Sequence, residues 1–476
     1  MTHGPILRKM ILFILPLMAT NLLQIFYNAA DVMIAGLSAD QNAVGAVGSC
    51  GVYLSLIINI FIGFSVGTDV VVARNIGAKD ADGISKSVHT SICMSAIFGI
   101  AGTVVGIAIA RPIYILMGYS GDLLELCLIY TYIYLIGMPF SSLTNFLSAI
   151  MRAKGDSQTP LYVLSATGIL NVLLNLVFVL GFKLTVEGLA IATAVSNLVS
   201  SLILFILLTK DKGDCKVSVR KLRPSKREFW DVFHIGVPSG IQNAFFSVSN
   251  MLIQSSIVRV DTYMTSALPA EEITYQPVIK GNSAASSLEN FAFAFMNPVA
   301  QAASTFTGQN VGVGDYRRVK KVLGVSCFLS VATGIIGSAI LIIFNAPLLS
   351  LYGVKSSSDI LSQIAYNTAL TRFIWRASPF FLISLMNTTA GILRGIGKSV
   401  TSAVISFIGT CIFRVAWVLT VFEYFMRRES PYVLESIYIS YPMTWILTSA
   451  AFFIIIGFSL KKLIKEQDKN AAKASI

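Results

Sequence analysis

Long apolar segments follow one another along most of the chain, separated by short clusters of glycine, proline and charged residues. A helix of about 20 mostly apolar residues is long enough to cross a bilayer. We therefore predict twelve spanning helices, at residues 8–37, 43–74, 87–110, 123–151, 160–181, 187–209, 229–259, 281–311, 319–345, 360–393, 399–424 and 435–460. The first segment is longer than the apolar core of a cleavable signal peptide, so we interpret it as the first of these helices.

The two halves of the chain repeat one another. Two motifs of the first half return in the second: Arg152-x-x-Gly155-x-Ser157-x-Thr159 as Arg394-x-x-Gly397-x-Ser399-x-Thr401, and Pro139-Phe140 as Pro379-Phe380. Each half contains six predicted spans, an even number, so both halves enter the membrane from the same side. Parallel repeats of this kind are related by an axis along the membrane normal.

The pattern thus predicts an all-α polytopic membrane protein made of two six-helix lobes with pseudo-twofold symmetry along the membrane normal. We expect an N-terminal lobe at 1–209, a basic cytoplasmic linker at 210–228, a C-terminal lobe at 229–460 and a cytoplasmic tail at 461–476. Two lobes with a cleft between them are the architecture of alternating access.

Composition supports the membrane class. Apolar and aromatic residues make up 55% of the chain, charged residues only 13%, and mean hydropathy is +0.72. A soluble domain carries about 25% charged residues, and disorder requires low hydrophobicity. Both of those classes are therefore excluded.

The net charge of +12 reflects topology more than a partner. With the N-terminus inside, the inner segments hold 26 lysines and arginines and the outer segments hold 7. This bias follows the positive-inside rule and places both termini in the cytoplasm, with the protein in the cell membrane. We interpret the basic linker as a topology anchor, with binding of acidic lipid headgroups as the alternative. No nucleic-acid partner is expected.

Polar side chains form a stripe on the first predicted span. Asn21, Gln24, Asn28 and Asp31 are spaced by three or four residues, so they share one helix face, and Tyr27 lies beside them. A carboxylate within the membrane costs roughly 2.5–3.5 kcal/mol and usually has a function. We therefore interpret Asp31 as a functional residue, with a purely structural hydrogen-bonding role as the alternative.

Two further spans of the first half carry polar pairs at i and i+4. Asn171 and Asn175 lie on the fifth span, Thr193 and Asn197 on the sixth. Each one alone is typical of a helix–helix hydrogen bond. Together with Asp31 they can form an oxygen-rich pocket suited to H⁺ or Na⁺, and too poor in carboxylates for Ca²⁺.

The second half has a similar stripe on its first span, formed by Ser239, Asn243, Asn250 and Gln254, with Gln242 adjacent. Ile253 occupies the position that corresponds to Asp31, so only the first half keeps this acid.

Further charges lie inside predicted spans: Glu289 in the eighth, and Arg372 and Arg376 in the tenth. A charge pair is the simpler interpretation, and substrate attraction is the alternative. Asp69, near the inner end of the second span, is interpreted as structural.

Sequence signatures of catalysis are missing. The six cysteines include no CxxC pair, the three histidines are scattered, and no nucleotide-binding loop, catalytic triad or metal motif occurs. We therefore predict that the protein is neither an enzyme nor an ATP-driven pump. We also expect no cofactor and no metal apart from a possible Na⁺.

Several segments resemble the MATE (multidrug and toxic compound extrusion) family, within the wider superfamily of multidrug and lipid-linked saccharide flippases. The most specific are GFSVG at 63–67, VARNIGAKD at 72–80, RAKGDSQTP at 152–160, GVPSG at 236–240, GNSAA at 281–285 and FTGQN at 306–310. The resemblance covers nearly the whole chain. It implies a secondary antiporter that exports organic, cationic or amphipathic drug-like compounds against inward H⁺ or Na⁺.

In this family, an aspartate of the first helix forms a cation site with polar residues of the fifth and sixth, positions matched here by Asp31, Asn171, Asn175 and Thr193. Members with this site often carry a second aspartate where Asn175 stands, so the single acid favours H⁺. Some members use a glutamate on the seventh helix, but residues 243–249 contain no acid.

For the substrate cavity we predict the polar and aromatic residues Gln24, Tyr27, Asn28, Asn197, Gln242, Asn250, Gln254 and Glu289. The expected partners are a small organic substrate and the lipid bilayer, and we expect a monomer. The alternative function is a flippase for a lipid-linked saccharide or cell-wall precursor, since such proteins share the scaffold. The twelve spans and only three deep arginines favour the antiporter.

Overall fold

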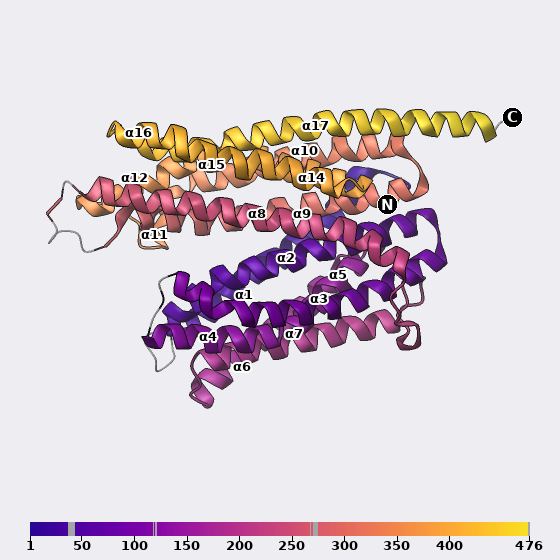
Figure 1. Cartoon of the computed structure of the whole chain (residues 1–476), viewed down its shortest axis with the longest axis horizontal. Coiled ribbons are helices and arrows are strands. Elements are labelled where there is room, and N and C mark those ends of the chain that lie inside the picture. Colours follow the sequence, from indigo (N-terminus) through magenta and orange to yellow (C-terminus); the bar gives the residue numbers. More distant parts are fainter. Residues whose placement is uncertain (37–42, 118, 120, 267, 270–274, 475–476) are drawn as a thin grey trace. The chain divides into compact units, whose positions relative to one another are not determined.

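The computed structural model describes residues 1–36, 43–117, 119, 121–266, 268–269 and 275–474, and these residues contain helices and no strand (Figure 1). The first part of the chain forms α1 (Ile6–Ala35), α2 (Ala43–Ala78), α3 (Ala81–Leu116), α4 (Gly121–Ile136), α5 (Met138–Lys154), α6 (Gln158–Leu176) and α7 (Val186–Thr209). A π-helical turn, Val177–Gly181, extends α6.

The later helices are α8 (Lys226–Thr265), α9 (Pro277–Val313), α10 (Tyr316–Ile343), α11 (Asn345–Ser350), α12 (Ile360–Arg372), α13 (Phe380–Ile396), α14 (Ser399–Ser406), α15 (Phe413–Trp417), α16 (Glu423–Arg427) and α17 (Val433–Ala474). Three π-helical turns join neighbours: Phe373–Ala377 continues α12, while Phe407–Ile412 and Val418–Phe422 connect α14, α15 and α16 into one rod.

Each of the twelve predicted spans coincides with one helix, one rod or one bent helical pair. Among the described residues, eight helices are long and apolar enough to cross a membrane, and two bent pairs bring the number to ten. The remaining two predicted spans coincide with α8 and α9, whose apolar windows are interrupted by polar side chains. The all-helical, multi-span fold class predicted from the sequence is confirmed.

Both bent pairs contain a proline of the repeated motif. Pro139 lies where α4 and α5 meet at 47°, and Pro379 lies where residues 360–377 meet α13 at 45°. Proline has no N–H to donate and its ring clashes with the preceding turn, so a helix kinks there. The hydrophobic pattern predicts 123–151 and 360–393 as continuous spans, so the two bends are not expected from the sequence.

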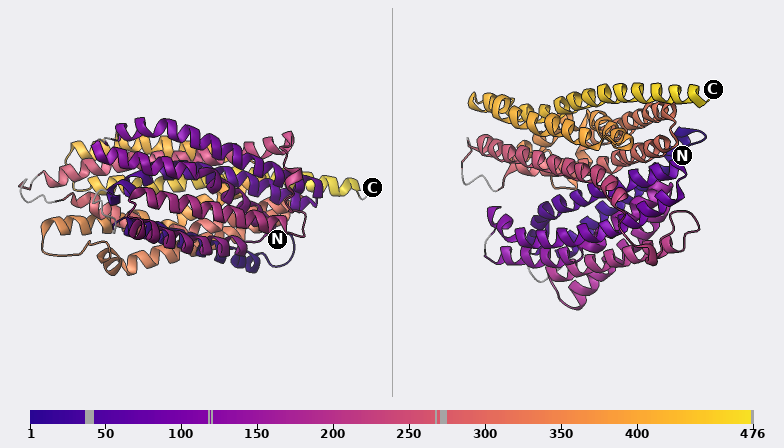
Figure 2. Two further views of the ribbon diagram at one scale, coloured as in Figure 1. Left: turned by 90° about the horizontal axis from the view of Figure 1, so that it is seen from below. Right: turned by 45° about the vertical axis from the view of Figure 1, so that its right-hand side comes forward.

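The described chain divides into two compact units. Unit 1 comprises residues 1–243, 305–315 and 395–400, and unit 2 comprises 244–304, 316–394 and 401–476. In unit 1, α1 packs on α6, α6 on α7, and α5 on both α2 and α3. In unit 2, the long helix α17 packs along α10, α12 and α15, and its C-terminal turns project past them (Figure 2). The lobe boundaries expected from the sequence stay predictions.

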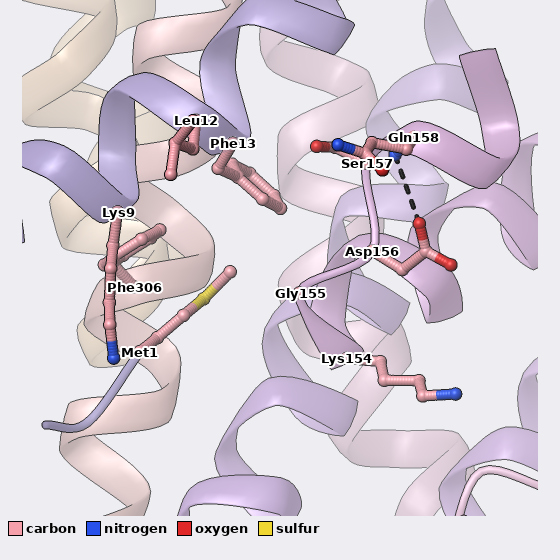
Figure 3. Close-up of a pocket in the computed structure, with 10 residues that line it drawn as sticks. All are labelled: Met1, Lys9, Leu12, Phe13, Lys154, Gly155, Asp156, Ser157, Gln158 and Phe306. Carbon is pink, nitrogen blue, oxygen red and sulfur yellow. Dashed lines mark hydrogen bonds between the residues drawn. The ribbon is translucent and has the colours of Figure 1, made fainter. Parts of the chain in front are cut away.

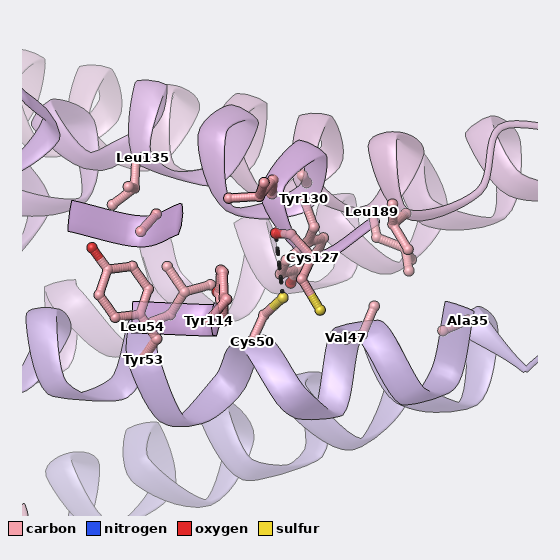
Figure 4. Packing of buried hydrophobic residues seen from close by; sticks show 14 of the residues in the cluster. Ala35, Val47, Cys50, Tyr53, Leu54, Tyr114, Cys127, Tyr130, Leu135 and Leu189 are labelled. Atoms are coloured by element: carbon pink, nitrogen blue, oxygen red, sulfur yellow. Dashed lines mark hydrogen bonds between the residues drawn. The ribbon is translucent and has the colours of Figure 1, made fainter. Parts of the chain in front are cut away.

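Aromatic and sulfur side chains fill the core of unit 1 (Figure 4). Tyr53 donates to the backbone oxygen of Gly106 over 2.6 Å, and its ring lies 5.5 Å from that of Tyr114, edge to face. Cys50 and Cys127 are fully buried among these residues, as small apolar side chains are. The core therefore satisfies its phenol groups while remaining apolar.

In unit 2, α9 and α12 touch at a glycine. A Cβ atom on Gly281 would lie 2.0 Å from the backbone oxygen of Ala365, so the two helices must separate to admit any side chain. We expect Gly281→Ala to lower the free energy of unfolding by about 1–3 kcal/mol, the usual cost of overpacking. Thermal unfolding of the purified protein measures the loss. Gly324→Ala on α10 is the control, because no heavy atom lies within 4 Å of its Cβ. Equal losses in both variants would disprove the close contact.

Within unit 1, the basic linker packs against α3. The backbone N–H of Ser218 donates to His89 Nε2 over 2.9 Å, and Cys215 is 3% exposed within an apolar cluster. Burial raises the pKa of the Cys215 thiol to about 11. At pH 8 only about one thiol in a thousand is then ionised, and the thiolate is the reactive form. We expect iodoacetamide to label Cys215 far more slowly than an exposed cysteine introduced as Lys212→Cys, as measured by mass spectrometry.

Candidate functional site

A polar cluster in unit 1 joins α1, α6 and α7. Asn175 donates from Nδ2 to Asp31 Oδ1 over 2.6 Å and to Asn171 Oδ1 over 3.3 Å, and Asn171 donates from Nδ2 to Thr193 Oγ1 over 3.4 Å. We call these four residues the coupling cluster. The i and i+4 spacing of the two asparagines on α6 presents both to the same side, where α1 and α7 pack. The structure thus brings together the four residues that the sequence analysis assigned to ion coupling.

The coupling cluster has spare acceptor capacity. Asn175 is completely buried, Asn171 is 7% exposed, and Asp31 is half-buried. Among the described residues, Asn175 Oδ1 accepts no hydrogen bond, although it lies beside a carboxylate. A buried amide oxygen without a donor is costly. A carboxylate and an unoccupied amide oxygen together form an environment that can hold a proton or a small cation.

Two tyrosines of α4 belong to the same environment, and the sequence analysis missed them. Tyr130 and Tyr134 lie within electrostatic range of Asp31, with ring centroids 6.1 Å apart. In the sequence they stand in an apolar run and resemble core residues. Their i and i+4 spacing was the available signal.

The position of α1 against α6 is fixed by Tyr27. Its hydroxyl donates to the backbone oxygen of Ser165 over 3.1 Å, and its ring occupies the space beside Gly168, where a Cβ would lie 2.0 Å from the ring. Of the other cavity candidates in this unit, Gln24 and Asn28 are exposed on α1, Asn197 is half-buried on α7, and Gln242 is buried on α8.

Unit 2 holds a second buried polar network around Glu289. Arg372 donates to both of its carboxylate oxygens, from Nε over 3.1 Å and from Nη2 over 2.7 Å, and Arg376 contacts the same carboxylate through Nη1. Arg372 also donates from Nη1 to Asn282 Oδ1 over 2.5 Å. A bidentate pair of this kind is the charge pair that the simpler interpretation expected.

The remaining candidates of unit 2 lie at the edge of this network. Asn282 donates to Gln254 Oε1 over 3.0 Å, and Arg414 donates to Asn250 Oδ1 over 3.4 Å. The eight cavity candidates are therefore divided between the two units, and a common cavity stays a prediction.

Asp69 has a hydrogen-bonding role in unit 1. Thr305 donates from Oγ1 to Asp69 Oδ2 over 2.8 Å, which ties the C-terminal part of α9 to α2. This contact fits the structural interpretation of Asp69.

An open cavity of about 530 Å³ lies at the opposite end of α1 from Asp31 (Figure 3). Phe13 of α1 points across it toward the turn between α5 and α6, and the remaining lining includes Lys9, Lys154, Asp156, Gln158 and Phe306. Asp31 follows Lys9 by 22 residues, about 33 Å along a helix. This cavity is therefore separate from the coupling cluster.

Comparison with known proteins gives consistent matches. The family model MatE matches residues 16–177 and 247–420. The chain is 28% identical over 352 residues to the probable multidrug resistance protein YoeA of Bacillus subtilis. This alignment covers 72% of the present chain and 73% of YoeA. It is 27% identical over 254 residues to the multidrug export protein MepA of Staphylococcus aureus. That alignment covers 52% of the present chain and 55% of MepA.

Solved structures share the fold at low sequence identity. A MOP superfamily transporter from Pyrococcus furiosus superposes with a TM-score of 0.84 at 20% identity, covering 97% of each chain. An outward-facing multidrug resistance transporter of the MATE family gives a TM-score of 0.82, also at 20% identity and 97% coverage of each chain.

Proposed function

The chain belongs to the MatE family, and on that premise we propose that it is a secondary antiporter exporting drug-like organic compounds against inward H⁺ or Na⁺. The relatives named above are described as multidrug resistance or export proteins, which supports a drug-like substrate. We further propose that the substrates are cationic or amphipathic and that transport proceeds by alternating access. No cofactor takes part, and the protein works as a monomer in the cell membrane with both termini in the cytoplasm.

One observation carries the coupling proposal: Asp31 of α1 accepts a 2.6 Å hydrogen bond from Asn175 of α6, next to an amide oxygen without a donor. Asp31 is the single carboxylate of the coupling cluster. A single acid can be neutralised by one proton or one Na⁺. The scarcity of further acids favours the proton.

Neutralising Asp31 changes what α1 prefers to contact. The ionised carboxylate accepts from Asn175, whereas the protonated form can donate to an amide oxygen such as Asn175 Oδ1. The two forms therefore stabilise different packings of α1 on α6. The ion and the substrate drive each other's movement when each binds one packing more tightly than the other.

Transport by the purified protein in liposomes tests this function. The probe is a fluorescent organic cation, ethidium, with a pH gradient or a Na⁺ gradient imposed separately. We expect uphill ethidium movement with the pH gradient, and its loss when an ionophore collapses that gradient. Movement driven only by Na⁺ would assign the other ion, while dependence on neither gradient would contradict the antiporter and favour a flippase.

Removing the hydrogen bond to Asp31 should weaken coupling. A hydrogen bond to a charged group contributes about 1.5–3 kcal/mol, so we expect Asn175→Leu to slow pH-driven ethidium transport by about tenfold or more. The control is Asn145→Leu on α5, where the amide donates to the backbone oxygen of Ser141 on its own helix. Equal rates in the two variants would show that Asn175 has no special role.

A further inference from the structure

Unit 2 buries more positive than negative charge. Arg372, Arg376 and Arg414 are 4%, 7% and 3% exposed, and Glu289 is completely buried. Among the described residues, Glu289 is the only carboxylate within ion-pair distance of any of these arginines. Arg372 donates to both carboxylate oxygens of Glu289. Three arginines and one glutamate give the cluster a net charge of +2.

In the described part of the chain, the hydrogen-bond acceptors of Arg414 are neutral groups. From α15 it donates to Ser249 Oγ over 3.2 Å, Asn250 Oδ1 over 3.4 Å and Thr444 Oγ1 over 3.4 Å. Its Nε has no acceptor among the described residues. A buried guanidinium without an opposite charge destabilises the folded protein unless a bound counter-ion compensates its charge.

Arg376 also has an N–H group without a hydrogen-bond acceptor among the described residues. Its Nε finds no acceptor in the described part of the chain, even though Nη1 contacts Glu289. Both guanidinium groups lie against one ring: the Cζ atoms of Arg376 and Arg414 are 4.4 Å and 4.3 Å from the centroid of Tyr441. Cation–π contact offsets part of each charge but supplies no acceptor for the N–H groups.

A third donor lies beside Tyr441. The indole of Trp445, one turn further along α17, is 5.9 Å away between ring centroids, and its Nε1–H has no acceptor among the described residues. Arg376, Arg414 and Trp445 thus surround one tyrosine with unused donors. A buried group of donors with excess positive charge matches an anion, because guanidinium groups bind carboxylates and other oxyanions through charge-assisted hydrogen bonds.

We propose that Arg376, Arg414, Tyr441 and Trp445 form a binding site for a small monovalent anion, either inorganic or the carboxylate of an organic compound. All four residues belong to unit 2, whereas the coupling cluster belongs to unit 1, and this proposal does not depend on the proposed function. An anion there neutralises part of the +2 charge and accepts from the unused N–H groups. Anion binding should therefore stabilise the folded protein by mass action.

Thermal unfolding of the detergent-purified chain measures this stabilisation. Sodium chloride or sodium benzoate is added stepwise to a low-salt buffer. We expect a saturable rise in Tm, and a loss of apparent affinity of tenfold or more in Arg414→Gln. The matched control is Arg428→Gln, since Arg428 also lies over a tyrosine ring, 4.4 Å from that of Tyr424, but is exposed.

The two salts distinguish the source of the anion. A saturable rise in Tm with chloride but not with benzoate assigns an inorganic ion, whereas saturation by benzoate at a lower concentration than by chloride assigns an organic carboxylate. Glu289→Gln should shift the affinity in the opposite direction, because it raises the net charge to about +3 and leaves the site intact. If Arg414→Gln does not fold, Arg414→Lys is the second variant. Lysine keeps the positive charge but lacks the planar guanidinium group with its several N–H donors, so binding should still weaken several-fold. A rise in Tm that does not saturate, or that is unchanged in the arginine variants, would overturn the proposal.

Discussion

Asp31→Asn is expected to abolish uphill export while the protein still folds and reaches the membrane. Asparagine has nearly the same shape and still accepts a hydrogen bond from Asn175, so the packing of α1 on α6 survives. It cannot exchange a proton and lacks the negative charge that an incoming cation would neutralise, so the two packings no longer respond to the ion. Coupling between sites is typically about 5–150-fold, and we expect this whole factor to vanish. Drug resistance of an efflux-deficient host, normalised to the amount of protein in its membrane, measures the loss.

The control for Asp31→Asn is Asp82→Asn, which removes an exposed carboxylate paired with Lys86. This variant should confer full resistance. Binding of substrate by Asp31→Asn, measured in detergent, should persist, because asparagine imitates the neutralised acid. Full resistance in a host that carries Asp31→Asn would refute the assignment of the coupling residue.

Glu289→Ala should cause the largest loss of stability. The substitution leaves Arg372 and Arg376 buried without their carboxylate, and breaking a buried ion pair from one side costs about 3–5 kcal/mol. We expect a lower yield of folded protein and a strongly reduced Tm after purification in detergent.

Its matched control is Glu423→Ala. Glu423 also pairs with an arginine, Arg259, whose side chain is 49% exposed. Exposed pairs contribute about 0–1 kcal/mol, so this variant should unfold close to the parent temperature. A Glu289→Ala protein as stable as Glu423→Ala would show that the buried pair is dispensable.

The coupling cluster was predictable because its signals are local. Asn171 and Asn175 repeat at i and i+4, Asp31 is conspicuous as an acid in an apolar segment, and the resemblance to a known family placed Thr193 beside them. The helices themselves were predictable for a similar reason, since the hydrophobic pattern over 20 residues is strong.

The site in unit 2 was only partly accessible to sequence reasoning. The pairing of Glu289 with Arg372 was one of two interpretations, since a buried charge requires a partner. The approach of Arg414 to Tyr441 was not foreseen, because these residues are 27 positions apart and meet only through the packing of α15 on α17. The angles at Pro139 and Pro379 were also missed, since a proline marks where a helix can bend, but neighbouring helices set how far.

The matched bends indicate the order of events in the history of the chain. Pro139 and Pro379 occupy equivalent positions in the two halves, and the helices bend there by 47° and 45°. Such agreement follows when a six-helix ancestor already carried the bend before its gene was duplicated. Asp31 and Ile253 are equally equivalent in position, yet their chemistry differs. The bend is thus common to both copies, whereas an acid at this position of the first helix is found in one copy alone.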